Sequence, residues 1–435
     1  MNNALRPAYS ASDRPVPRRV IQPVRRFMAV ETAGGVVMLA GAIIALIWAN
    51  SPWDASYVRF FETPIELRVG GVIDLDLTVH EWVNDGLMSL FFLVVGLEIK
   101  RQLVHGELRD RRAAALPAVA ALGGMIVPAA IYILFNLGGA TDGFGVPVAT
   151  DIAFAVGVVT LAGSRVPLGV RIFILTLAVV DDIGGIVVIA VFYAEGVSFA
   201  WLGAAVACIV GAYVSRRLEV RSLVPYLAFG TVCWYSLHSA GVEAAIVGVV
   251  FGLLAPAHPF HDPSRFGERI EEAVRHFERT DHNVPVEIAT YVREVASPLD
   301  RVEHHLTPWV SFLIVPIFAL ANAGVSVSTA GLDVDVFAGV AAGLVIGKIV
   351  GIVSFTWLAV RFGVGRLPQR TGWLHILGVG AAGGIGFTVA LFVAGLSFDD
   401  ADLLRSAKLG ILAASTTAGL LAYAILRLAS REERH

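Results

Sequence analysis

Long apolar runs, separated by short polar segments, follow one another along almost the whole chain. A helix needs about 20 mostly apolar residues to cross the hydrocarbon core of a bilayer, which is about 30 Å thick. Runs of this kind cover residues 29–49, 80–98, 113–136, 146–163, 168–194, 199–216, 222–237, 241–257, 307–325, 336–361, 372–397 and 404–429. The pattern therefore predicts an all-α polytopic membrane protein, with about 12 transmembrane helices within residues 29–429.

The composition excludes the main alternatives. Of the 435 residues, 56% are hydrophobic and 16% are charged, whereas soluble domains have about 25% charged residues. An apolar chain with a net charge of −3 is not disordered, and it shows no basic face for nucleic acid. Two cysteines, Cys208 and Cys233, lie in apolar runs and do not form a disulfide scaffold.

Lysine and arginine gather on every second loop. The basic segments are the arm 1–28, the loops 99–112, 216–221 and 361–370, the loop at Arg165, and the tail 430–435. The intervening loops are acidic or poor in basic residues, as at 74–76, 142, 195, 333–335 and 399–402. Because cytoplasmic loops carry the excess of Lys and Arg, both termini are predicted to be cytoplasmic. The arm has no apolar core, so it is not predicted to be a cleavable signal.

Residues 65–79, IELRVGGVIDLDLTV, alternate apolar and polar side chains around Gly70 and Gly71. This pattern predicts a β-hairpin on the outer face. A lone hairpin is only marginally stable in water, which favours pairing with a second subunit in a homodimer. The alternative is a hairpin that lies flat on its own protomer.

The segment 258–305 is a predicted cytoplasmic insert. Its apolar residues follow helical spacing at Phe266, Ile270, Ala273, Val274 and Phe277. Six of the 11 histidines fall here: His258, His261, His276, His282, His304 and His305. They suggest a pH sensor, because His titrates near neutrality. The simpler interpretation, a solvated amphipathic helix with surface histidines, is the one we favour.

Four charged residues are predicted to lie at membrane depth: Asp151, Asp181, Asp182 and Lys348. A charge at the bilayer centre costs about 2.5–3.5 kcal/mol, so each needs a partner or a wet cavity. Neighbours on a helix point about 100° apart, so Lys348 can pair with one of Asp181 and Asp182 while the other faces a cavity. The alternative is an ion pair that only fixes helix packing. Three acids against one base leave negative charge that a hard cation or protons can balance.

Two apolar spans contain residues that interrupt helices. Thr150 and Asp151 lie inside VPVATDIAFAVG, and their side chains compete for backbone hydrogen bonds. Gly383, Gly384 and Gly386 lie inside GVGAAGGIGFTVALFVAG, where they either break the helix or allow close packing.

These two interrupted spans are related to each other in the sequence. DIAFAV aligns with GIGFTV, and the spans are the fourth and the eleventh. Their odd separation predicts inverted repeats, spans 3–5 and 10–12, with an interrupted helix in each; such pairs mark the binding sites of transporters. Asp151 is expected to offset the positive helix ends, and Lys348 the negative ones.

From Arg26 to Arg427 the chain resembles the NhaA family of bacterial sodium/proton antiporters. The matching strings, in family order, are FFLVVGLEIKRQL, PAVAALGGMIVPA, VATDIAFAVG, GSRVPL, LAVVDDIGGIVVIAVFY, FALANAG, GLVIGK and GGIGFTVALF. The resemblance implies 12 helices with crossed, partly unwound spans 4 and 11, dimers joined partly by the outer hairpin, and a bacterial inner-membrane protein that is no enzyme and has no cofactor.

The resemblance also implies roles for individual residues. Asp182 would be the central sodium ligand and proton carrier, with Asp181 and Thr150 as further sodium ligands. Asp181 would pair with Lys348, which would itself take part in proton exchange. Thr150 and Asp151 would compensate the broken helix ends and help hold the cation. Glu98 would line the cytoplasmic entrance, and Glu303 and His304 would belong to a pH-responsive cluster. Asp85 would sit nearer the outer side.

The chain departs from the family pattern at several positions. Gln102 stands where Glu is usual, Thr307 and Glu243 stand where His is common, and the segment after span 8 is longer. These departures concern the pH at which exchange is activated, and not the residues of the transport site.

The predicted mechanism is alternating access, in which a small cation and protons compete for one carboxylate site. The resemblance implies that the exchange is electrogenic and that lithium can replace sodium. An intramembrane aspartyl protease would need a Gly-x-Gly-Asp run, which precedes neither Asp181 nor Asp151. A sodium-coupled symporter of an organic substrate with a similar inverted-repeat fold is the more serious alternative. The paired aspartates with a single lysine favour proton exchange.

Overall fold

The computed structural model describes residues 33–69, 73–163, 166–194, 196–220, 222–258, 297–328 and 330–432. The arm 1–28, the helical spacing predicted at 266–277 and the last three residues lie outside these ranges. The first part of the helical framework comprises α2 (Ala33–Ala49), α3 (Asp54–Phe61), α4 (Val79–Glu81), η3 (Trp82–Leu87), α5 (Met88–Val104), η4 (Glu107–Arg109), α6 (Arg111–Phe135), η5 (Thr141–Val148), α7 (Ile152–Ala162), α8 (Leu168–Phe192), α9 (Phe199–Arg217), α10 (Val224–Ser239) and α11 (Ile246–Leu254). After the insert follow α14 (Pro298–Trp309), η7 (Val310–Ile314), α15 (Val315–Asn322), α16 (Val334–Ala342), η8 (Gly343–Gly347), α17 (Lys348–Arg361), α18 (Trp373–Gly383), α19 (Phe387–Ser397) and α20 (Ala401–Glu432).

Each predicted apolar run coincides with one or more of these helices. By length and composition, 6 continuous helices in the described ranges are suited to cross a membrane, or up to 9 if each of three bent pairs is one span. The predicted run 80–98 lies within the unbroken helical segment of α4, η3 and α5, from Val79 to Val104. The runs 222–237 and 241–257 form helices of 16 and 9 residues, shorter than a typical span. The molecule is thus a multi-pass, mostly helical membrane protein.

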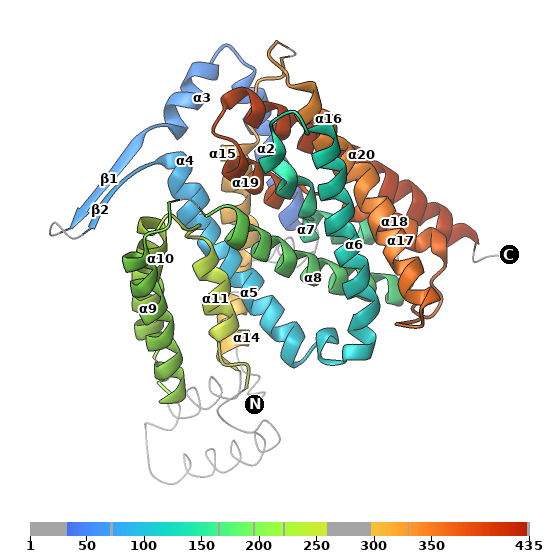
Figure 1. Cartoon of the computed structure of the whole chain (residues 1–435), viewed down its shortest axis with the longest axis horizontal. Helices are drawn as coiled ribbons and strands as arrows, with labels where there is room; N and C mark the ends of the chain where they lie inside the picture. The colour runs from blue at the N-terminus through green and yellow to red at the C-terminus, as the bar shows by residue number, and fades with distance from the viewer. Residues whose placement is uncertain are drawn as a thin grey trace, which may run out of the picture.

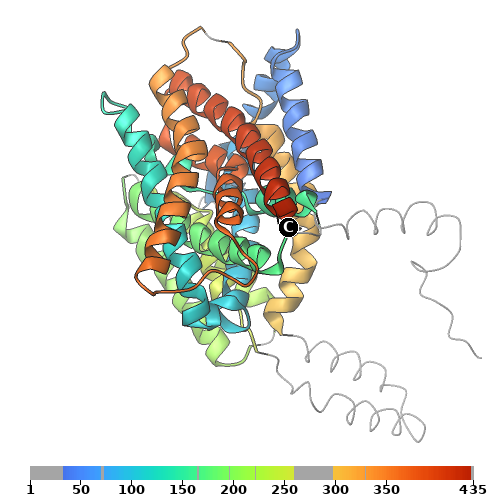
Figure 2. The same cartoon turned by 90° about the vertical axis from the view of Figure 1, so that its right-hand side faces the viewer.

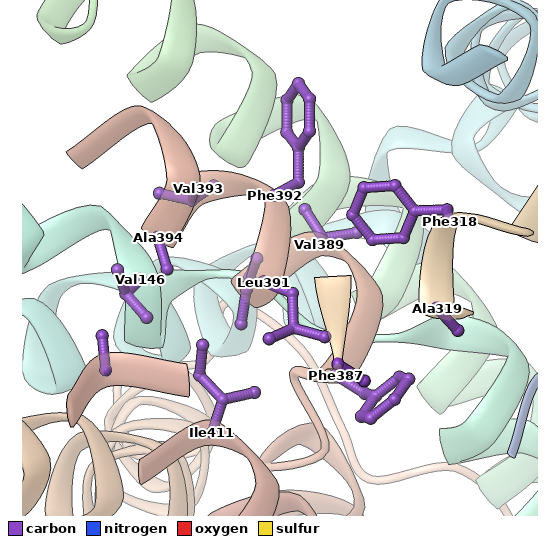
Figure 3. Close-up of a cluster of buried hydrophobic side chains, with 14 of the residues drawn as sticks. Val146, Phe318, Ala319, Phe387, Val389, Leu391, Phe392, Val393, Ala394 and Ile411 are labelled. Carbon is purple, nitrogen blue, oxygen red and sulfur yellow. The ribbon is translucent and has the colours of Figure 1, made fainter. Parts of the chain in front are cut away.

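The core surrounds the helix α19. Its residues from Phe387 to Ala394 are all buried, as expected for a helix that is apolar on every side. Figure 3 shows Val389, Leu391 and Phe392 of α19 among Val146 of η5 and Phe318 of α15. Figure 2 shows the long C-terminal helix α20 beside the α16–α17 segment, on the face that covers this core. The span with the glycine-rich interruption therefore lies inside the molecule.

The predicted β-hairpin is present. β1 (Pro64–Val69) pairs antiparallel with β2 (Ile73–Thr78), and Ile65 faces Leu77 across the ladder. The hairpin extends away from the helices (Figure 1). The hairpin therefore projects beyond the helices of its own protomer, and its pairing with a second subunit stays a prediction.

Candidate ion-binding site

Two interrupted helices meet in the interior. The elements η5 and α7 meet at a bend of 40°, and α18 and α19 meet at a bend of 45°. The first interruption covers residues 149–151, and the second covers residues 384–386. Such irregular backbone is tolerated at membrane depth only where it is buried in protein or lines a cavity. Both predicted helix breaks therefore exist, at the predicted residues.

Hydrogen bonds tie the two interruptions to each other. The Thr150 hydroxyl donates to the Gly383 carbonyl over 2.9 Å, and the Asp151 amide donates to the Ile385 carbonyl over 2.6 Å. These carbonyls belong to the end of α18, where helical partners are missing. The first interruption thus satisfies the carbonyl end of α18.

Asp151 serves the amino ends of two helices. One carboxylate oxygen, Oδ1, accepts from the Phe154 amide over 3.2 Å and so caps α7. The other oxygen, Oδ2, accepts from the Thr388 amide over 3.1 Å and from its hydroxyl over 2.6 Å, at the start of α19. A carboxylate is stabilising at positive helix ends, so the expected compensation by Asp151 is confirmed for two ends at once.

Lys348 pairs with Asp181 and also serves a carbonyl end. Its ammonium lies 2.7 Å from Asp181 Oδ2, and neither side chain is exposed. The same Nζ donates to the Val148 carbonyl at the end of η5 over 2.5 Å. Lys348 follows the π-helical turn η8, and such turns often occur at functional sites. The predicted ion pair and the predicted compensation of a negative helix end are therefore both confirmed.

The glycines at the second interruption allow the helices to approach closely. A Cβ atom on Gly384 would lie 2.4 Å from the Leu344 carbonyl oxygen, and one on Gly386 would lie 3.0 Å from the Ala149 carbonyl oxygen. The two interpretations of these glycines are therefore compatible, because the break and the close packing occur at the same residues.

Asp182 differs from its neighbours in having no partner. Its carboxylate makes no hydrogen bond or ion pair within the described ranges, and it is repelled by Asp181 and Asp151. Together with Asp181 it lines a small cavity that has room for about one water molecule. The remaining walls are mostly apolar: Phe91, Phe92, Val95, Ala149, Gly185, Ile186, Ile189 and Val389. Asp181 Oδ1, which is buried, also lacks a hydrogen-bond partner.

The donors around this cavity suit a hard cation that binds and leaves. They comprise Asp181 Oδ1 and the carboxylate oxygens of Asp182, with the Thr150 hydroxyl close to Asp181 at the helix break. Such oxygens are hard ligands. Within the part of the chain that the structure covers, no group of three or more His, Cys, Asp or Glu side chains could hold a metal ion. The arrangement therefore does not resemble a permanent metal centre.

A second polar cluster lies at the far end of α5. Arg101 forms ion pairs with Glu98 and with Glu303 Oε1, the latter over 3.2 Å, and Gln102 donates to Glu98 over 2.8 Å. His304 is exposed and forms no hydrogen bond or ion pair with any residue described. The structure thus brings Glu98 and Glu303 together through Arg101 and leaves His304 outside.

Sequence reasoning missed two groups at these sites. Thr388 lies in the aligned string GIGFTV, but nothing in the alignment indicated that it would bind Asp151. In the sequence Arg101 is one of several basic residues of the loop 99–112, although it joins residues about 200 positions apart, Glu98 and Glu303. No signal in the sequence distinguishes Arg101 from the other basic residues of that loop.

Comparison with known proteins places the chain in a family. Residues 25–426 match the family described as Na+/H+ antiporter 1. The Na+/H+ antiporter NhaA 2 of Myxococcus xanthus is 44% identical over 93% of this chain and 89% of its own length. The NhaA of Anaeromyxobacter is 45% identical (95% and 92% covered), and that of Rhodopirellula baltica 42% (94% of each). The chain belongs to the NhaA family of Na+/H+ antiporters.

Proposed function

We propose that this protein exchanges sodium ions for protons across the bacterial inner membrane, using the cavity of Asp181 and Asp182. The observation that carries the proposal is the unpartnered Asp182 carboxylate beside the Asp181–Lys348 ion pair. The relatives named as Na+/H+ antiporters support the same reaction. Lithium, with the same charge and hardness, is expected to replace sodium.

Charge balance explains why the two ions compete. Asp181 is neutralised by Lys348, and Asp151 is held by helix amides and a hydroxyl. Asp182 keeps an uncompensated charge, which either a sodium ion or a proton can neutralise. In a cavity this small the two exclude each other, so their fluxes are coupled without separate gates.

The ion pair offers a place for a second proton. A sodium ion that takes an oxygen of Asp181 weakens the hold of that carboxylate on Lys348, which can then release a proton. Sodium binding would thus displace more than one proton, and the exchange would be electrogenic. Alternating access would expose the cavity to one side of the membrane at a time, by movement around the crossed helices η5–α7 and α18–α19.

The membrane topology is part of the proposal. Each of the 12 predicted runs coincides with a helix, and the basic loops alternate with the non-basic ones. Both features support 12 spans with the two termini in the cytoplasm. In this orientation the hairpin lies outside, and its exposed apolar residues Ile65 and Leu67 favour pairing with a second copy.

The cluster of Glu98, Arg101 and Glu303 would lie at the cytoplasmic end and respond to internal pH. Its two carboxylates share one arginine, so protonation of either changes the pairing of the other. His304 would act only at long range, because it is exposed.

Inverted membrane vesicles with a pH-sensitive dye test the reaction. Added sodium should collapse an imposed pH gradient, whereas choline should not. The symporter alternative is tested by radioactive sodium efflux with and without a pH gradient. Efflux that is unaffected by the gradient would contradict the proposed exchange.

A further inference from the structure

A second group of ionisable side chains lies near the hairpin end of the molecule, outside the Asp181–Asp182 cavity. His238, at the end of α10, forms an ion pair with Asp85 of η3 over 3.3 Å from Nδ1 to Oδ2. Both side chains are partly exposed, by 32% and 23%. Glu243, between α10 and α11, interacts electrostatically with both of them.

The geometry of Asp85 and His238 is held by aromatic contacts. Trp234 Nε1 donates to the Asp85 carbonyl over 3.1 Å, and the Trp234 ring stacks on His238 at 5.8 Å between centroids. Trp82 in turn stacks on Trp234, also at 5.8 Å between centroids. The ion pair is therefore built into the contact between η3 and α10.

Glu243 also faces inward. It borders a tightly packed apolar gap, with no room for a water molecule, lined by Phe92, Ile186, Ile189, Ala245, Ile246, Val249 and Phe392. Phe92, Ile186 and Ile189 line the Asp181–Asp182 cavity as well. The gap beside Glu243 and the Asp181–Asp182 cavity are thus neighbours, separated by apolar side chains.

One face of α8 connects them. Asp182, Ile186 and Ile189 are spaced four and three residues apart, which places them on the same side of a helix. Phe92 packs against Phe392 at 5.5 Å between centroids, which closes the gap from the other side. The gap beside Glu243 is closed to water in this conformation, so these side chains must move before one or a few water molecules can join Glu243 to Asp182.

We propose that Asp85, His238 and Glu243 form a proton relay between the outer solution and Asp182, an inference that rests on the proposed function. A proton from solution binds the Asp85–His238 pair, passes to the Glu243 carboxylate, and passes through water to the Asp182 carboxylate. Each group accepts one proton and releases one, so charge and atoms balance at every step.

The chemistry of the trio favours protons over sodium. The positive charge of a protonated His238 already balances Asp85, which leaves Glu243 as a single carboxylate. One carboxylate without further acidic ligands is a poor cation site, in line with the absence of metal-suited clusters among the residues described. The other charged groups that act on the trio are Glu81, which acts on His238, and His80, which interacts with Asp85.

Glu243→Gln separates proton transfer from structure. Glu243 Oε1 accepts from the Ala245 amide over 3.1 Å, and a glutamine oxygen can do the same, but the glutamine amide cannot take up and release a proton as a carboxylate does. Glu243→Asp restores a carboxylate. Glu62→Gln, at the exposed end of α3, is the matched control for loss of an outer carboxylate.

Right-side-out vesicles allow the outer pH to be varied at fixed internal pH, and sodium-dependent proton movement is measured. We expect E243Q to slow exchange by about tenfold or more, because a positioned proton carrier typically contributes at least that much. We also expect E243Q to flatten the outer pH profile, E243D to restore both, and E62Q to behave as wild type.

An E243Q protein with the wild-type rate and outer pH profile would overturn the relay but leave the proposed exchange intact. Wild-type vesicles without any sodium-dependent proton movement would instead overturn the proposed function. Should E243Q fail to fold, as judged by size-exclusion chromatography, His238→Gln is the second test. It keeps a donor toward Asp85, and an unchanged outer pH profile of H238Q would overturn the relay.

Discussion

Lys348 Nζ lies 2.7 Å from Asp181 Oδ2, with both side chains completely buried. Lys348 also donates to the Val148 carbonyl, so the ion pair joins α8, α17 and the end of η5. The charges of the site are therefore also part of what holds the interrupted helices in place.

Lys348→Ala should destabilise the fold and weaken exchange. It leaves Asp181 buried without its cation, and breaking a buried pair in this way costs about 3–5 kcal/mol. Thermal unfolding in detergent measures the loss. The double variant Asp181→Asn with Lys348→Met should lose less stability than K348A, because no unpaired charge remains. Equal melting temperatures of wild type and K348A would refute a stabilising ion pair.

Gly384→Ala should be far more harmful than Gly395→Ala. The added Cβ on Gly384 would lie 2.4 Å from the Leu344 carbonyl oxygen, whereas nothing lies within 4 Å of the corresponding position on Gly395. Overpacking of this kind costs about 1–3 kcal/mol, and G395A is expected to be neutral or slightly stabilising. Melting temperature and exchange rate are measured for both. If G384A and G395A behave alike, the close approach at the second interruption is refuted.

Thr388→Val should weaken the connection between the two interruptions. It removes the 2.6 Å hydrogen bond to Asp151 Oδ2 but keeps the shape of the side chain. The loss of a hydrogen bond to a charged group is expected to cost about 1.5–3 kcal/mol. Thr417→Val is the control, because its hydroxyl bonds only the Ala413 carbonyl on an exposed face. If T417V were less stable than T388V to chemical or thermal unfolding, this role of Thr388 would be contradicted.

The two members of the predicted pH-responsive cluster should respond differently to mutation. Glu303→Gln removes a carboxylate paired with Arg101, whereas His304→Gln changes an exposed side chain. We expect the pH profile of exchange to move in E303Q and to move little in H304Q. The profile is measured in inverted vesicles at saturating sodium. A larger shift in H304Q would show that the exposed histidine, not the arginine-centred cluster, responds to pH.

Much of the site could be predicted because placing a charged side chain in lipid has a high free-energy cost. The pairing of Lys348 with one aspartate followed from that cost, as did the need of the remaining carboxylates for other compensation. Helix-breaking residues at Thr150 and Asp151 and at the glycines of the second interruption predicted where the helices end. These predictions rest on local chemistry, which is visible in a single sequence.

The contacts between distant segments could not be predicted in the same way. A threonine within an apolar helix usually bonds its own preceding turn, so Thr388 gave no sign that it faces Asp151. Arg101 was indistinguishable from the other basic residues of its loop. The π-helical turn η3 between α4 and α5 is also hidden, because the apolar run 80–98 does not reveal it. These features depend on how helices are placed in three dimensions.

The most direct test of a shared site is a count of the protons that sodium binding releases. Titration calorimetry of the purified protein, in two buffers with different ionisation enthalpies, gives this number at constant pH. We predict that sodium binding releases protons in the wild type, and that Asp182→Asn abolishes both the sodium-binding heat and the release. Sodium binding to the wild type without proton release, or unchanged binding and release in D182N, would contradict competition at Asp182.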